Sequence, residues 1–444
     1  MARRSVTIAR YRWLILPLVG VLCRVAQGAP VRADSTYRDY LDAARAAELA
    51  NDPTLARVQL LRALDLIHGH PDVQYLLARV ETQLGHPDSA IARLRTIAAM
   101  GVAYDAAHDP MLVALRDRPG FDSVVQAMDV NRRQIGASPV VLTLADTDAL
   151  AEDVAYDAST RTFYVSSVHH RKILALPERG APRDFATAAR DSLDAVMALA
   201  IDAKRHVLWA TTVGAPQEEG YGAADSARSA VLRYDLRTGR LLRRYPLPAD
   251  GRHHDPGDMT VDPSGTVIIS DATGSVYAIP RSRDSLILLV GPGTFHSPQT
   301  PAVAPDGRIF VADYARGVGV IDPRTHAVEW IGHADTIAMS GIDGMYLVGR
   351  TLLAVQNGTD PPRVVRFELD PQLRRVVSWS VIERGTPHLG QPTHGAVVGD
   401  TFYFIGNSGW ERFDEDGALV PDPGRRAPMI LRAPVHGGPS SVTP

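Results

Sequence analysis

Two adjacent carboxylates, Glu152 and Asp153, open the strand-like segment AEDVAYDAST at residues 151–160. A third carboxylate, Asp343, opens the similar segment DGMYLV. Carboxylate oxygens that converge from separate segments suit a hard divalent cation such as Ca²⁺, which accepts about six to eight oxygen ligands in irregular geometry. A bound cation would also offset the repulsion between neighbouring carboxylates. Whether these residues meet depends on the fold that positions them.

From about residue 138 the chain reads as short strands separated by turns, as in TVIISDATGSVYAI and GRIFVADYARGVGVI. The residues that end the first strand of each unit are 42 to 60 positions apart: Asp157, Asp202, Asp262, Ala304, Val348 and Val398. That spacing is typical of four-stranded propeller blades. We therefore predict a mainly β fold, with a six-bladed β-propeller over residues 138–435 and a disordered tail over 436–444.

In such a propeller the first strand of each blade lies beside the central channel. Counting back five positions from each strand end places six residues at one mouth of the channel: Glu152, Met197, Gly257, Gln299, Asp343 and Thr393. Because strands alternate in direction, the loops between second and third strands return to the same face. The candidate substrate-binding residues gathered there are Asp153, His169, Asp271, Asp313, Arg316, Asn357 and His394.

These features resemble the gluconolactonase / senescence marker protein / luciferin-regenerating enzyme family of six-bladed propellers. The resemblance covers residues 140–435 and rests on Glu152 five positions before Asp157, on PDG at 305–307 and on DGM at 343–345. In that family one divalent cation, usually calcium or zinc, polarises a lactone carbonyl. The resemblance implies that Glu152 and Asp343 are metal ligands and that Asp343 is also a catalytic base.

The sequence departs from the family pattern at three positions. Gln299 replaces a metal-binding Asn, and Gly257 replaces another Asn near the substrate, which leaves Asp258 beside it. Asp153-Val154 stands where the family has Gly-Pro. The longer amide of Gln299 can still ligate a metal, and Asp258 is a second candidate catalytic residue. Strictosidine synthase-like and NHL-type propellers remain alternative assignments.

Residues 36–134 have a helical period instead, with alanine and leucine recurring three and four positions apart. At an offset of 34 residues, similar residues align: Ala44 with Ala78, Arg45 with Arg79, Pro53 with Pro87, Ala56 with Ala90, and Leu60 with Leu94. This period resembles tetratricopeptide repeats. About two repeats are fewer than the three or so needed for independent stability, so we expect this unit to pack on the propeller.

Residues 1–28 read as a secretory signal peptide, with a basic start, the apolar run WLILPLVGVL and small residues at Ala26-Gln27-Gly28. The apolar run is too short to span a bilayer, so no membrane span is expected. The signal contains the only cysteine, Cys23, and five arginines without an acidic residue, so the mature chain is thiol-free and acidic. Nucleic acid is therefore not an expected partner, and a periplasmic or secreted bacterial location is predicted.

Two functions remain open at this stage. The first is a hydrolase of lactone- or ester-like small molecules, with Ca²⁺, or alternatively Zn²⁺ or Mn²⁺, held by Glu152, Gln299 and Asp343. Either Asp343 or Asp258 would activate water. The second is a non-catalytic binding or assembly protein that holds a protein partner through its helical repeats. Residues 213–230 form a long loop that is either a lid over the channel mouth or a mobile decoration.

Overall fold

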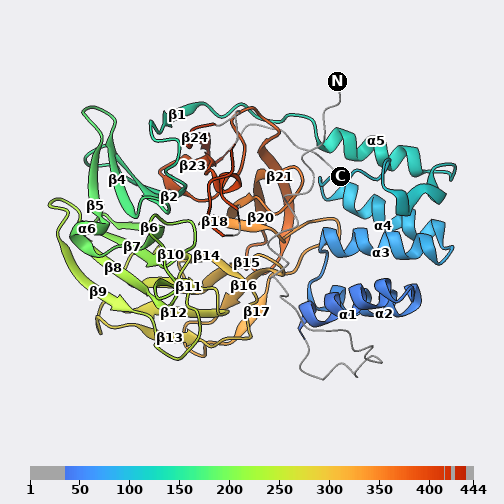
Figure 1. Ribbon diagram of the computed structural model, residues 1–444, viewed down its shortest axis with the longest axis horizontal. Helices are drawn as coiled ribbons and strands as arrows, with labels where there is room; N and C mark the ends of the chain where they lie inside the picture. Colours follow the sequence, from blue (N-terminus) through green and yellow to red (C-terminus); the bar gives the residue numbers. More distant parts are fainter. Residues whose placement is uncertain (1–35, 415, 422–425, 437–444) are drawn as a thin grey trace.

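The computed structural model describes residues 36–414, 416–421 and 426–436. The predicted signal peptide at 1–28 and residues 437–444 of the predicted tail lie outside the described residues. The described chain forms a β-propeller with a helical unit beside it, as Figure 1 shows. The prediction of a mainly β, six-bladed propeller preceded by an all-α unit is confirmed.

The helical unit folds because apolar stripes on short, well-delimited helices face one another. Pro53, Pro71 and Pro87 occupy first turns, where a missing N–H is not needed, and Thr36 forms a capping box with Asp39. The described helices of this unit are α1 (Tyr37–Leu49), α2 (Pro53–Leu66), α3 (Pro71–Gln83), α4 (Pro87–Ala99), η2 (Pro110–Leu115) and α5 (Phe121–Asn131). None of the described helices is both long and apolar enough to cross a membrane. Their assignment as tetratricopeptide repeats stays a prediction.

Each blade of the propeller is a four-stranded sheet with antiparallel pairing. The first blade contains β2 (Ala151–Asp157), β3 (Thr162–Ser167), β4 (Lys172–Pro177) and β5 (Arg183–Thr187). The second contains β6 (Ala195–Asp202), β7 (Val207–Val213), β8 (Ser229–Asp235) and β9 (Leu241–Pro246). The third contains β10 (Asp258–Val261), β11 (Val267–Asp271), β12 (Ser275–Ile279) and β13 (Ile287–Val290).

The remaining blades repeat this order, except for the last. The fourth contains β14 (Pro298–Val303), β15 (Ile309–Asp313), β16 (Gly317–Ile321) and β17 (Val328–Trp330). The fifth contains β18 (Ile342–Val348), β19 (Thr351–Gln356), β20 (Arg363–Leu369) and β21 (Val376–Arg384). The sixth contains β22 (Gly395–Val398), β23 (Thr401–Asn407), β24 (Met429–Pro434) and, as its outer strand, β1 (Val140–Thr143).

The sixth blade closes the ring by joining the two ends of the propeller. Strand β1 pairs antiparallel with β24, with Val140 opposite Leu431. The inner strands β2, β6, β10, β14, β18 and β22 each contact the inner strand of the next blade, and β22 contacts β2. The amino-terminal ends of these six strands therefore face one mouth of the channel, and this arrangement positions the candidate site.

The helical unit packs against the fourth and fifth blades (Figure 1). Arg363 on β20 is fully buried, and its Nη1 donates to the carbonyl oxygen of Met100 at 2.7 Å. Arg384 at the end of β21 donates to the carbonyl oxygens of Arg133 and Val130. The expected packing of a short helical unit on its neighbour is thus present, and polar contacts to backbone carbonyls form much of the interface.

Candidate metal centre at the channel mouth

Four carboxylates and one imidazole gather at this mouth of the channel, on strands that lie far apart in the sequence. The residues are Glu152 and Asp153 on β2, Asp258 on β10, Asp343 on β18, and His394 immediately before β22. Each residue keeps no more than 7% of its surface exposed. Three of these carboxylates and the imidazole face one another, and we call Glu152, Asp258, Asp343 and His394 the channel group.

His394 lies at the centre of the channel group. Its Nε2 is 2.6 Å from Asp258 Oδ1 and 3.8 Å from Asp343 Oδ1, and its Nδ1 is 3.8 Å from Glu152 Oε1. The Nε2 nevertheless has no hydrogen-bond partner of acceptable geometry. A buried ring nitrogen without an aligned partner, facing carboxylates from separate blades, is arranged to meet another group.

Neutral side chains support two of the carboxylates. Thr300 Oγ1 on β14 lies 2.5 Å from Asp258 Oδ1 and 2.9 Å from the carbonyl oxygen of Asp343. Asn357, just after β19, donates to Asp343 Oδ2 and accepts a 2.9 Å hydrogen bond from the Tyr314 hydroxyl. These contacts fix the rotamers of the acidic side chains, which is what a preorganised binding site requires.

Two long loops meet near Glu152. Trp410 in η4 (Trp410–Arg412) donates its indole N–H to Glu152 Oε2. The same β23–β24 connection passes close to the β7–β8 connection, because a Cβ at Gly417 would lie 1.9 Å from the carbonyl oxygen of Pro216. The long loop expected at residues 213–230 is therefore packed at the mouth against the loop that carries Trp410.

The electrostatics of the site are dominated by buried negative charge. Burial, with further repulsion from neighbouring carboxylates, raises the pKa of Glu152 to about 8, that of Asp153 to about 7 and that of Asp343 to about 6, although His394 opposes each rise. Burial alone would lower the pKa of His394, but Asp258 and Asp343 raise it well above its usual value. No ion pair within the described residues joins these carboxylates to an arginine or lysine.

The channel group has the composition of a metal site. Glu152, Asp343 and His394 each offer one ligand atom, and these atoms lie within 4.8 Å of one another. His394 is the one cationic partner of these buried carboxylates among the described residues, and a divalent cation would balance the remaining negative charge. The residues present therefore fit a metal ion, and the fit rests on side chains from the first, fifth and sixth blades.

Asp153 is adjacent to Glu152 in sequence, but its carboxylate serves the backbone. Its Oδ2 accepts the N–H of Leu199 in the second blade, and its Oδ1 accepts the N–H of Val154, each at 2.7 Å. Asp153 was predicted to bind substrate. The structure instead shows it linking the inner strands of two blades.

Gln299, a predicted metal ligand, is not brought into the channel group. Its amide donates to the carbonyl oxygen of Ser297 at 3.3 Å and to Ser297 Oγ at 3.1 Å, and Thr300 takes the place facing the group. The pairing of β14 with β15 shifts register between Pro298 and Pro301. Because side chains alternate between faces, a shift of one residue exchanges the side chain that enters the channel.

Asp271 and Asp313 were predicted to contact substrate, and both are fully buried at the ends of β11 and β15. Asp271 pairs with His254 Nδ1 at 2.6 Å and accepts the N–H of Asp255 at 2.8 Å. Asp313 accepts backbone N–H groups of His296, Ser297, Ala315 and Arg316. Their carboxylates close the loops at this face, a common use of aspartate in turns.

Arg316 and His169, two further residues predicted to bind substrate, lie outside the channel group. The guanidinium of Arg316 lies over the ring of Trp330, 4.0 Å from its centroid. His169 is in the β3–β4 loop, beside His170 and close to Glu219 of the β7–β8 loop. Only Asn357 and His394, of the predicted substrate-binding set, contact the channel group.

Sequence reasoning missed Thr300 and Trp410, and it placed Tyr314 at this face without giving it a role. Thr300 follows Gln299 directly, so an error of one residue in counting back from the strand end places Gln299 at the channel instead of Thr300. Tyr314 lies in one of the mouth loops that the sequence singled out, and its aromatic type gave no signal of a supporting role. Trp410 lies in the connection before β24, whose course no periodicity in the sequence reveals.

No protein-family profile and no curated protein matches this sequence. Similar solved structures include the calcium-binding protein regucalcin from Agrobacterium tumefaciens, at 16% identity and a TM-score of 0.45 over 67% of this chain and 95% of the other. A gluconolactonase from Xanthomonas campestris matches at 15% identity and a TM-score of 0.43, over 68% of this chain and 100% of the other. A luciferin-regenerating enzyme matches at 14% identity and a TM-score of 0.44, over 64% and 91%.

These structural neighbours carry the names of the family that the sequence motifs resemble. Their identities and TM-scores do not establish that this chain belongs to that family. Fold likeness at this level says nothing about activity, because one fold supports many functions. The function must therefore be argued from the side chains of this chain.

Proposed function

We propose that this protein is a divalent-cation-dependent hydrolase that acts on lactone- or ester-like small molecules at the channel mouth. The observation that carries the proposal is the channel group itself: three buried carboxylates around a histidine, with no arginine or lysine paired to them among the described residues. The substrate class is the one implied by the Glu152 and DGM motifs. A carbonyl substrate suits a site built around a Lewis-acidic cation.

The donor set favours Zn²⁺ or Mn²⁺ over the Ca²⁺ expected from the sequence. Ca²⁺ takes oxygen ligands, whereas His394 adds an imidazole nitrogen to the carboxylates of Glu152 and Asp343. Gln299, which was expected to supply another oxygen, donates its amide N–H to Ser297. We infer that Glu152, Asp343 and His394 hold the ion.

When bound, the cation would polarise the substrate carbonyl, and the side chains would supply the remaining steps. Asp343 is the first candidate base, as the DGM motif implies, and it would also be a ligand of the ion. Asn357 orients Asp343 from one side. Asp258 is the alternative base, held by Thr300 and next to His394 Nε2.

The direct test is turnover of a panel of lactones and carboxylic esters by metal-loaded protein. We expect Asp343→Asn to lower kcat/KM by roughly 100-fold or more, as loss of a general base or ligand does. Asp306→Asn, in a turn between β14 and β15, is the matched control and should retain native turnover. Equal activity of Asp343→Asn and native protein would exclude catalysis at the channel group.

The proposed location is the periplasm or the exterior of a bacterial cell. The support is the basic start and short apolar run in residues 1–28. Expression with and without these residues, followed by cell fractionation, tests it. Retention of the complete chain in the cytoplasm would contradict export.

A second function is favoured by one feature of the helical unit. Leu49 at the end of α1 is 83% exposed, and Leu55 and Val58 on α2 are each 39% exposed. Exposed apolar residues on the first helices of a repeat unit suit a protein partner. A non-catalytic binding or assembly role would leave partner capture intact in Asp343→Asn and weaken it in Leu49→Ser.

A further inference from the structure

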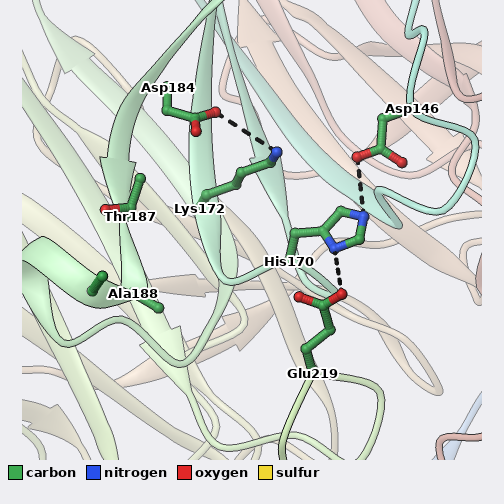
Figure 2. A pocket seen from close by; sticks show the side chains of 8 residues that line it. Asp146, His170, Lys172, Asp184, Thr187, Ala188 and Glu219 are labelled. Atoms are coloured by element: carbon green, nitrogen blue, oxygen red, sulfur yellow. Dashed lines mark ion pairs between the residues drawn. The ribbon is translucent and has the colours of Figure 1, made fainter.

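A second group of metal-ligating side chains lies on the rim of the first blade, apart from the channel group. His169 and His170 occupy the β3–β4 loop, and Glu219 comes from the β7–β8 connection of the next blade. Figure 2 shows His170 between Asp146 and Glu219 at the edge of a pocket. Glu219 Oε1 lies 3.1 Å from His170 Nδ1 and 3.8 Å from His169 Nε2.

The ring nitrogens that face away from Glu219 each lie next to an oxygen atom, in a hydrogen bond for His169 and at ion-pair distance for His170. His169 Nδ1 lies 2.6 Å from the carbonyl oxygen of Gln217, which only an N–H can satisfy. His170 Nε2 lies 3.0 Å from Asp146 Oδ2. Metal-binding histidines use this arrangement: one ring N–H donates to a carbonyl or carboxylate, and the other nitrogen is left with its lone pair for the ion.

The carboxylate partner is held in place by its backbone. The N–H of Glu219 donates to the carbonyl oxygen of His169 at 2.9 Å, and Arg171 Nη1 donates to the carbonyl oxygen of Glu219 at 3.2 Å. Asp146 is fixed in turn, because its Oδ1 accepts the N–H of Asp148 at 3.0 Å. The three side chains that would bind the ion, and the residues that hold them, are therefore already close together in the metal-free protein.

The geometry points to a second divalent-metal site, for a nitrogen-preferring ion such as Zn²⁺, formed by His169 Nε2, His170 Nδ1 and Glu219 Oε1. These atoms lie within 4.8 Å of one another. Ligands at the Zn–N distance of about 2.0–2.1 Å in tetrahedral geometry are roughly 3.3 Å apart, so small side-chain rotations suffice. Two histidines and one glutamate are an established zinc ligand set that leaves one position open.

His170 and Glu219 line a pocket of about 340 Å³ whose lining also includes Lys172, Asp184 and Thr187 (Figure 2). The site also joins two blades, because Glu219 belongs to the connection over residues 214–228 and the histidines belong to the first blade. An ion bound there would link the connection over residues 214–228 to the β3–β4 loop. This connection packs near Trp410. Binding at this site does not depend on the channel group.

The test is calorimetric titration of chelator-treated protein with Zn²⁺, combined with amide hydrogen exchange over residues 214–228. His169→Gln and His170→Gln should each bind one Zn²⁺ fewer per chain than native protein, while Asp343→Asn should retain the rim ion. Asp146→Asn should weaken the rim ion roughly 10–100-fold, the usual effect of losing a supporting carboxylate. Zn²⁺ should slow exchange over 214–228 in native protein and have no such effect in His170→Gln.

Asp184→Asn is the matched control, because it lines the same pocket and contributes no ligand atom. Thermal melting of each variant establishes that it is folded. Native Zn²⁺ stoichiometry and affinity in both folded histidine variants would overturn the proposal. So would exchange over residues 214–228 that is unchanged by Zn²⁺ in native protein.

Discussion

Glu152 and Asp153 are neighbours on one strand, yet their carboxylates meet different surroundings. Glu152 faces His394 and the indole of Trp410, whereas Asp153 accepts backbone N–H groups of Leu199 and Val154. The alternation of side chains along a strand sends consecutive residues to opposite faces. One carboxylate is thus available to a cation, and the other holds two blades together.

Substituting these two residues should therefore separate metal binding from stability. Asp153→Ala leaves the buried N–H of Leu199 without an acceptor, so we expect it to lower the free energy of unfolding by about 1–3 kcal/mol. Urea denaturation of chelator-treated protein measures this loss. Glu152→Gln should weaken metal binding and raise the unfolding free energy of the metal-free protein at pH 7, because glutamine removes the cost of keeping Glu152 protonated in the folded state. An equal loss of stability in both variants would contradict the division of roles.

The metal-free protein should lose stability as pH rises from about 5 to 8. Glu152 and Asp343 have pKa values of about 8 and 6, above the ordinary carboxyl values of 4.5 and 3.8. A raised carboxyl pKa means that the folded state holds a proton the unfolded chain has released. The stability that these protonated carboxyl groups give to the folded state is therefore lost as pH rises through their folded-state pKa values. The raised pKa of His394 acts in the same direction.

Thermal melting at a series of pH values, with and without Zn²⁺, measures this dependence. Zn²⁺ should remove most of the decline, because the ion replaces the protons on the channel group and its affinity rises as they leave. A melting temperature of the metal-free protein that stays constant or increases from pH 5 to 8 would contradict the account.

At the scale of the elements, short irregularities in the inner strands decide which side chains enter the channel. Strands β2, β14 and β18 shift register near their first residues, whereas β10 and β22 pair without a shift. A fixed count of five positions from the strand end found Glu152 and Asp343 correctly. In the third, fourth and sixth blades it reached Gly257, Gln299 and Thr393, each one residue before the side chain found at the channel group.

For this reason the sequence predicted where the candidate site lies better than it predicted which side chains form it. The number of blades could be predicted from the spacing of 42–60 residues between units, because each blade repeats the same strand and turn pattern. The register within one strand depends on bulges, which leave no signal in a single sequence. The loop-closing contacts of Asp271 and Asp313 could not be foreseen, because a carboxylate that closes a loop and one that binds a ligand look alike in sequence.

Gly344 shows how closely two inner strands approach beside the channel group. A Cβ at this position would lie 2.9 Å from the carbonyl oxygen of Thr393, which precedes His394. Gly344→Ala should therefore displace the entry to β22, lower the melting temperature and weaken metal binding. Gly257→Ala, whose Cβ would meet only Asp255 Oδ1 at 3.9 Å, is the matched control and should resemble native protein in both measurements. Native metal affinity in Gly344→Ala would show that the approach of these strands does not hold the site.

At the scale of the whole molecule, the helical unit and the propeller meet at a closely packed junction. Gly101 follows α4 with a φ of +71°, and a Cβ there would lie 2.6 Å from the Trp379 ring and 2.9 Å from Arg363 Nη1. Because Arg363 is buried and donates to Met100, little movement is available to it. The helices and the fifth blade therefore depend on each other for stability.

Gly101→Ala should loosen this junction, so that the helical unit unfolds below the melting temperature of the propeller. Differential scanning calorimetry should then resolve two transitions where native protein has one. Gly85→Ala is the matched control, since its φ of +76° carries the same backbone strain but a Cβ there meets nothing within 4 Å. Two transitions in both variants would assign the effect to strain and not to the junction.

The central claim is that the channel group binds a divalent cation. The most direct measurement is calorimetric titration of Zn²⁺, Mn²⁺ and Ca²⁺ into chelator-treated protein that carries His170→Gln, so that the rim site is not counted. We predict one saturable site that prefers Zn²⁺ or Mn²⁺ to Ca²⁺, releases protons on binding, and is lost when Asp343→Asn is added. No binding of any of the three ions, or binding that Asp343→Asn leaves unchanged, would contradict the claim.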